Sequence, residues 1–392
     1  MIPSPPSLLT GQFFWVTSMN FFFFASVNAF VLLPLYIQQL GGSEVQIGLV
    51  MGMYSAAGIF CQPLVGAWVD RVGRRPFLLL GVSLAAAASI GFNLLASLPV
   101  FAVLRAFQGI GFSAFFVANY TMVVDLVPPA RRGWALGIFG ISGLLSTALS
   151  PLAGEVVIRH LGFHAFFAMT TLLALTALAL AFRVRESGGA LALPRRGVQV
   201  IREGLGEILR LPMALAFFFG LGSGTIFTFL PTFGELLGVT SLALFYTAYA
   251  VAAMFVRAVG GGLSDTLGRR AVIVPSMFVQ AVATGILAVL GIVIGARATI
   301  PVLPFLFLAG LLAGGAHGFL YPALAALLMD ETAEARRGSA VGIFSSVFLA
   351  GNALGSMMFG YVIHGFSYGG MWSALTVLLT AGFIASFRLR SG

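Results

Sequence analysis

Long apolar runs, separated by short polar or charged stretches, make up most of the chain. A helix needs about 20 mostly apolar residues to cross a lipid bilayer, and these runs have that length. They lie near residues 12–38, 44–69, 76–97, 99–126, 134–158, 163–183, 212–236, 241–263, 271–295, 302–328, 338–364 and 369–387. The pattern predicts an all-α membrane protein with twelve transmembrane helices.

The longest polar separator, residues 184–211, divides the predicted helices into two groups of six. We therefore expect an N-terminal six-helix bundle over 1–183, a linker over 184–211 and a C-terminal six-helix bundle over 212–392. Apolar residues recur in the linker at the spacing of a helix, with charged residues between them. This predicts an amphipathic helix on the membrane surface, the alternative being a plain linker. The apolar positions are Val198, Ile201, Leu205, Ile208 and Leu209.

Composition supports the membrane assignment. The chain is 59% hydrophobic and 8% charged, whereas soluble domains carry about 25% charged residues. The single cysteine, Cys61, excludes a disulfide framework and a cysteine metal site. We expect no metal and no cofactor. No cleavable signal is evident, so the first apolar run is interpreted as a retained helix.

The formal net charge of +9 comes from arginine, which is the only basic residue besides histidine. Arginines cluster after every second predicted helix, which predicts that these loops and both termini are cytoplasmic. Only Arg159 and Arg297 fall on the other side. Clusters between apolar runs are typical of a membrane protein, so we expect a bacterial-type inner membrane location and no nucleic-acid partner.

One charged loop occurs twice. Asp70–Arg75 returns as Asp265–Arg270, an offset of 195 residues, and a glycine stands four residues before each aspartate. Asp125 recurs as Asp330, an offset of 205. The repeat predicts two homologous halves and hence a transporter. The residues predicted to act in gating are Gly66, Asp70, Arg71, Gly73, Arg74, Arg75, Asp125, Gly261, Asp265, Gly268, Arg269, Arg270 and Asp330.

These loops have a physical logic. Gly66 would let a neighbouring helix approach closely, and Gly73 would permit the tight turn. Arg74 can reach Asp125, and Arg269 can reach Asp330 in the second copy. We expect such charge clusters to hold the two halves together on the cytoplasmic side and to separate when that side opens.

The loop resembles the signature motif of the major facilitator superfamily. Arg105–Gly109 also resembles the RxxQG pattern of its proton-coupled efflux members, whereas Ser150–Glu155 departs from their GPxxGG pattern at its first and last positions. The resemblance covers essentially the whole chain. It implies a monomeric transporter in which two six-helix halves expose a path alternately to each side of the lipid bilayer.

The resemblance also implies which helices line the path, namely the first, fourth, seventh and tenth. The side chains expected to bind the transported molecule are Asn20, Asn28, Arg105, Gln108, Phe112, Phe115, Asn119, Thr225, Phe229, His317 and Tyr321. Four of these residues also have a structural interpretation. Arg105 could bond neighbouring carbonyls, His317 could be a packed neutral histidine, and Asn20 and Asn28 could join helices.

The twelve acidic residues all fall near helix ends or in loops, and none lies at the predicted bilayer centre. The candidates for proton coupling are therefore His317, Glu155 and Glu235, although Glu155 could simply pair with Arg159, four residues on. The expected function is proton-coupled efflux of a small apolar or amphipathic compound. The alternative is uptake or facilitated diffusion of a polar metabolite such as a sugar or organic acid. An enzyme is not expected, because no nucleophile and base occur together.

Overall fold

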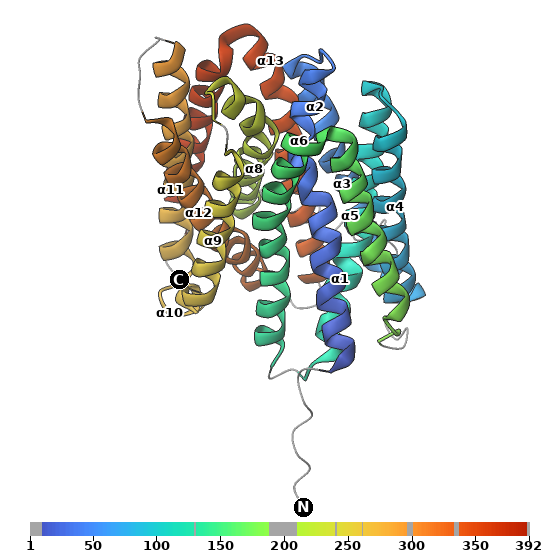
Figure 1. Cartoon of the computed structure of the whole chain (residues 1–392). Helices are drawn as coiled ribbons and strands as arrows, with labels where there is room; N and C mark the ends of the chain where they lie inside the picture. The colour runs from blue at the N-terminus through green and yellow to red at the C-terminus, as the bar shows by residue number, and fades with distance from the viewer. Residues whose placement is uncertain are drawn as a thin grey trace, which may run out of the picture.

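The computed structural model is a bundle of long helices that run roughly side by side (Figure 1). The structure describes residues 10–128, 131–187, 210–239, 241–260, 262–295, 301–332 and 337–389. The predicted surface helix of the linker and Gly261 lie outside the described residues.

The helices of the N-terminal half include a short 3-10 segment, η1, between α1 and α2. They are α1 (Gly11–Asn28), η1 (Ala29–Leu32), α2 (Leu33–Gln39), α3 (Glu44–Val72), α4 (Arg74–Leu94), α5 (Leu98–Leu126) and α6 (Arg132–Arg183). Those of the C-terminal half are α8 (Leu211–Leu236), α9 (Ala243–Gly260), α10 (Leu263–Thr266), α11 (Arg269–Gly295), α12 (Val302–Asp330) and α13 (Arg337–Ser386).

Two of these helices are too long for a single crossing. A helix rises about 1.5 Å per residue, so the 52 residues of α6 and the 50 of α13 exceed the roughly 30 Å of a bilayer core twice over. Each reverses at one residue with positive φ, Gly162 (79°) or Ser367 (66°). Ten described helices can span a membrane, and because two of them cross twice, the predicted twelve crossings are confirmed.

The internal repeat is visible in the backbone. Gly162 and Ser367 stand 205 residues apart, the offset found for Asp125 and Asp330. Gly73 (φ 104°) and Gly268 (φ 87°) both adopt a positive φ and stand 195 residues apart. The two halves therefore turn at corresponding positions, as the arginine loops predict. Three of the four turn residues are glycine, which is suited to a positive φ because it has no β-carbon.

The halves lie next to each other, the N-terminal half in blue to green and the C-terminal half in yellow to red (Figure 1). They meet along two seams. One seam joins α3 to the first part of α13, and the other joins the first part of α6 to α9. α6 and α13 thus contribute to both the interior of their own half and the contact with the other half.

Candidate functional site

The first seam is closed by direct contact between helix backbones. A β-carbon at Gly48 of α3 would collide with the carbonyl oxygen of Ser356 in α13. A β-carbon at Gly360 would lie only 2.5 Å from the carbonyl oxygen of Glu44. Glycine is needed at both positions because the two helices leave no room for a side chain between them.

Two hydrogen bonds cross the same seam farther along. Ser55 Oγ donates to Asn352 Oδ1 over 2.8 Å, and Ser346 Oγ donates to the carbonyl oxygen of Ile59 over 2.9 Å. The contacts between the halves thus run from the beginning of α3 to beyond its middle. This beginning is the end of the molecule opposite the arginine loops.

Glu155 closes the second seam at that same end. Its carboxylate accepts a hydrogen bond from Arg159 Nη2 over 2.8 Å, the pair that the helical spacing predicts. Its other oxygen accepts from the backbone N–H of Ala243, at the first turn of α9, over 2.7 Å. Glu155 therefore joins the N-terminal half to the C-terminal half through a charge-assisted hydrogen bond.

A small cavity of about 190 Å³ lies beside this contact. Both Glu155 and Glu235 line it, together with Arg159. Residues from each half form its wall, so two of the three candidates for proton coupling face one cavity between the halves. His317 belongs to a different part of the molecule.

At the arginine end the expected ion pairs are present, but each lies within one half. Arg74 Nε donates to Asp125 Oδ2 over 3.1 Å, and Arg269 Nε donates to Asp330 Oδ2 over 3.0 Å. Arg269 also bonds Asp265 of α10. Among the described ion pairs none joins the two halves at this end. A charge contact between the halves at this end stays a prediction.

Glu186 has a role that the sequence did not indicate. Its carboxylate accepts the backbone N–H groups of Arg74 and Arg75 over 2.9 and 3.0 Å, which caps the start of α4. A β-carbon at Gly73 would lie 2.8 Å from Glu186 Oε2, so this glycine is required for both its φ and the approach of the carboxylate. A β-carbon at Gly66 would meet no described atom within 4 Å, so the close helix approach expected there stays a prediction.

The asparagines expected along the path join helices of the N-terminal half. Asn119 Nδ2 donates to Asn20 Oδ1 over 3.0 Å, and Asn20 Nδ2 donates to Ser142 Oγ over 2.8 Å. Asn28 Nδ2 donates to Ser146 Oγ over 3.0 Å. Their amides connect α1 to α5 and α6, which agrees with the structural interpretation of these residues.

Arg105 is buried, with 6% of its surface exposed. It donates to Gln108 Oε1 over 2.8 Å, and its guanidinium carbon lies 4.6 Å from the centre of the Tyr54 ring on α3. Phe112 packs on the same tyrosine, with ring centres 5.6 Å apart. Three of the predicted binding residues thus gather around Tyr54. Phe115 does not join them, because it stacks on Phe23 inside the N-terminal half.

The predicted binding residues of α8 are buried in contacts rather than presented to a path. Thr225 donates to the carbonyl oxygen of Leu221 in its own helix. The ring of Phe229 reaches the closed seam, 3.2 Å from where a β-carbon at Gly48 would stand. These placements belong to the present closed seam, and binding by these residues stays a prediction.

The α12 candidates lie in an aromatic environment. The ring of His317 lies 5.1 Å from that of Phe219 and 5.5 Å from that of Tyr249, measured between centres. Tyr321 contacts Ser345 through the two hydroxyl groups, over 3.3 Å. His317 and Tyr321 therefore share one face of α12, as their spacing of four residues predicts.

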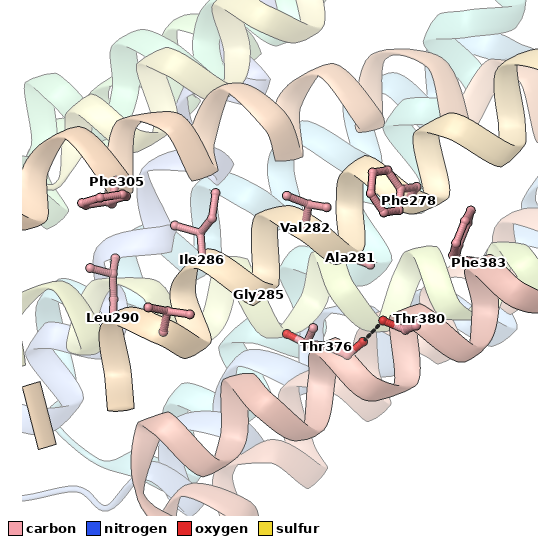
Figure 2. Close-up of a pocket in the computed structure, with 11 residues that line it drawn as sticks. Phe278, Ala281, Val282, Gly285, Ile286, Leu290, Phe305, Thr376, Thr380 and Phe383 are labelled. Carbon is pink, nitrogen blue, oxygen red and sulfur yellow. Dashed lines mark hydrogen bonds between the residues drawn. The ribbon is translucent and has the colours of Figure 1, made fainter. Parts of the chain in front are cut away.

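A larger cavity, of about 560 Å³, lies on the flank of the C-terminal half (Figure 2). It is formed by α11, the last part of α13 and Phe305 of α12, and among the described residues that line it the polar side chains are Thr376 and Thr380. Both hydroxyls are bonded to carbonyl oxygens of their own helix. None of the predicted site residues lines it, so this apolar groove is separate from the candidate site between the halves.

Comparisons with known proteins agree with this architecture. The sequence profile of the Major Facilitator Superfamily matches residues 13–296 and again 241–391. The inner membrane transport protein YajR of Escherichia coli is 30% identical over 46% of this chain, a match that spans 39% of that relative's length. The multidrug resistance protein MdtG of Salmonella choleraesuis is 25% identical over 83% of this chain and 82% of its own.

Solved structures show the same fold at low sequence identity. The nucleoside transporter NupG superimposes with a TM-score of 0.79 at 13% identity, over 96% of this chain and 99% of its own. A bacterial homologue of the human lysosomal transporter Spinster gives 0.72 at 17% identity, over 98% of each chain. The chain therefore belongs to the major facilitator superfamily, and it is a multi-pass integral membrane transporter rather than an enzyme.

Proposed function

We propose that the protein exports a small apolar or amphipathic compound in exchange for protons. MdtG, which is named for multidrug resistance, matches most of the chain. This similarity supports export rather than uptake. A second relative of that name, multidrug resistance protein 3 of Bacillus subtilis, is 31% identical over 32% of this chain and 25% of its own. The protein would act as a monomer, with the path between its own two halves.

The contacts between the halves support a cycle of alternating access. They close the end opposite the arginine loops, through Gly48, Gly360 and Glu155. If the arginine loops are cytoplasmic, as the charge bias predicts, this conformation is closed toward the outside. Export would then require these contacts to break and new ones to form at the arginine end.

The cluster around Tyr54 would bind part of the transported molecule. Arg105 and Gln108 each keep one buried polar nitrogen without a hydrogen-bond partner, Nε and Nε2 respectively. Phe112 supplies an apolar surface beside them. Unused donors next to an aromatic ring suit a compound with one polar or charged group and an apolar body.

The bond between Glu155 and Ala243 is the observation that carries the coupling proposal. Protonation of Glu155 would remove its charge and weaken both the ion pair with Arg159 and the bond across the seam. The outer end would open more readily with a proton bound. Glu235 faces the same cavity, but the hydrogen bond across the seam is formed by Glu155, so we favour Glu155.

Glu155→Gln tests this assignment. The amide keeps the shape but cannot carry the negative charge, so we expect the stimulation of export by a pH gradient to fall by about tenfold or more, since one charge-assisted bond contributes about 1.5–3 kcal/mol. The measurement is transport of fluorescent amphipathic dyes in proteoliposomes, with and without an imposed pH gradient. Exchange of dye without a gradient should persist.

Glu235→Gln and His317→Ala test the two other candidates for proton coupling. If either of these removes the response to the pH gradient and Glu155→Gln does not, coupling belongs to that residue. If no variant changes the response and the gradient drives nothing in the wild type, export by proton exchange is wrong. Uptake or facilitated diffusion of a polar metabolite would then be the better description.

The membrane orientation has its own test. Reporter fusions after Ser187 and at the C-terminal Gly392 are expected to be active only in the cytoplasm, and a fusion at Ala298 only outside. Both expectations follow from the arginine bias together with an even number of crossings. A C-terminal reporter that is active outside the cell would contradict the orientation.

A further inference from the structure

A second basic and aromatic cluster lies in the C-terminal half. It consists of Arg257 and Tyr249 on α9 together with His317 and Tyr321 on α12. Arg257 is close enough to both tyrosine hydroxyls and to His317 to interact with them electrostatically. The proposed function makes no use of Arg257.

The guanidinium of Arg257 lies at the seam between the halves. A β-carbon at Gly140, on α6 of the N-terminal half, would stand 3.5 Å from Arg257 Nη1. Tyr321 also lies near Tyr120 of α5, which belongs to the N-terminal half. The cluster therefore faces the other half of the protein, where the transport path is expected, and not the lipid.

Its polar atoms are only partly used. Arg257 Nε and His317 Nδ1 are buried without a hydrogen-bond partner. Among the described side chains, no carboxylate forms an ion pair with Arg257. The acids described above pair elsewhere, Glu155 with Arg159 and Asp265 with Arg269. A cation inside a membrane protein is costly without a counter-charge, so this position favours a bound anion.

An apolar wall adjoins the cluster. The ring centre of Phe348 lies 5.6 Å from that of Tyr321 and 5.0 Å from that of Phe219, and Phe219 in turn packs on His317. A molecule bound here would place an anionic group against Arg257 and an aromatic or aliphatic body against these rings. An apolar wall beside a cation suits the amphipathic compound that the proposed function exports.

The two halves hold their arginines differently. Tyr54 and Tyr249 occupy corresponding positions, 195 residues apart, and each packs against a glycine of the neighbouring helix, Gly109 or Gly314. Arg105 lies over Tyr54 and is bonded to Gln108. Arg257 has no such support from a bonded side chain among the described residues, and its donors remain available to a ligand.

We propose that Arg257, with His317, Tyr249 and Tyr321, forms an anion subsite, so that the transported compound is an amphipathic organic anion. The inference rests on the proposed export function in one respect only, namely that the anion bound at this subsite is the exported compound. The guanidinium would bind a carboxylate through its planar set of donors, and the Phe219 and Phe348 rings would contact the apolar body.

The test compares two probes that differ in charge and little in shape, 1-naphthaleneacetate and 1-naphthaleneacetamide. Binding to the purified full-length protein in lipid nanodiscs is measured by isothermal titration calorimetry. We expect the wild type to prefer the carboxylate. Arg257→Gln should weaken carboxylate binding by about ten- to a hundredfold, the usual contribution of a hydrogen bond to a charged group, and leave amide binding unchanged.

Arg183→Gln is the matched control, because Arg183 also lies over an aromatic ring, Trp15, but at the end of α6. It should keep the preference. Arg257→Lys retains the charge and should keep part of the carboxylate affinity, which separates loss of charge from loss of fold. Thermal unfolding of each variant in the same nanodiscs identifies any that is misfolded. If Arg257→Gln is misfolded, the carboxylate affinity of Arg257→Lys decides whether the charge at this position binds the anion.

Three results would overturn the proposal. The carboxylate fails to bind the wild type at any concentration up to its solubility, or the amide binds equally well, or Arg105→Gln removes the preference while Arg257→Gln does not. The binding measurement needs no pH gradient, so it tests the anion subsite separately from the proposed export by proton exchange. Failure of dye export with the preference intact would refute export alone, and loss of the preference with export intact would refute the subsite alone.

Discussion

Arg105→Ala is expected to abolish transport, and Arg105→Lys to restore little of it. Alanine removes both the stacking on Tyr54 and the hydrogen bond to Gln108, which leaves the buried amide of Gln108 with fewer partners. A lysine keeps the charge but lacks the planar guanidinium that can stack and donate at once. We expect activity to fall by about a hundredfold or more for alanine, in line with the loss of several coupled contacts.

The measurement is dye export from proteoliposomes at equal protein content, with the amount of folded protein checked by size-exclusion chromatography. Arg183→Gln is the control, because it removes an arginine stacked on an aromatic ring at the end of α6. Transport by Arg105→Ala at the wild-type rate would mean that Arg105 only fills space.

Gly48→Leu is expected to prevent closure of the outer end and to stop transport. The backbone of α13 lies directly against Gly48, at the carbonyl oxygen of Ser356, so a leucine must push α3 and α13 apart. Because interfaces between packed helices do not deform continuously, we expect the halves to separate at this end. Export should fall to background, since one of the two alternating states is lost.

The separation can be measured directly. In a background with Cys61→Ser, a cysteine replaces Leu242, a residue with 6% of its surface exposed that lines the cavity beside Glu155. A membrane-impermeant maleimide should label it faster in Gly48→Leu than in the parent. Gly285→Leu is the control, because Gly285 faces the flank groove and has ordinary contacts. Equal labelling rates in Gly48→Leu and Gly285→Leu would contradict the assignment of the contact at Gly48 to closure of the outer end.

The fold could be predicted from the sequence because the membrane imposes a length and a composition on each crossing. The reversals at Gly162 and Ser367 fall between predicted helices, at 158–163 and 364–369. The pairs Arg74–Asp125 and Arg269–Asp330 could be predicted as well. The repeated loops place these charges at neighbouring helix ends of the same half.

The site was harder to predict, because the spacing of residues in a helix shows which side chains share a face but not what that face touches. Phe112 and Phe115 are both on α5, yet the first packs beside Arg105 and the second packs inside the half. The contact of Glu155 with Ala243 joins residues 88 positions apart. The cap that Glu186 forms on α4 joins residues 111 and 112 positions apart, so no local motif indicates it.

The glycine contacts between α3 and α13 also bear on leakage. Where two backbones touch, as at Gly48 and Gly360, the space between them is too small for a row of water molecules. The polar bonds across this seam from Ser55 and Ser346 contribute only about 1 kcal/mol each. Such a closure can block protons and still be opened by thermal motion. We therefore expect that a single methyl group added at either glycine, as in Gly48→Ala, lets protons leak across the membrane before it lowers the stability of the fold.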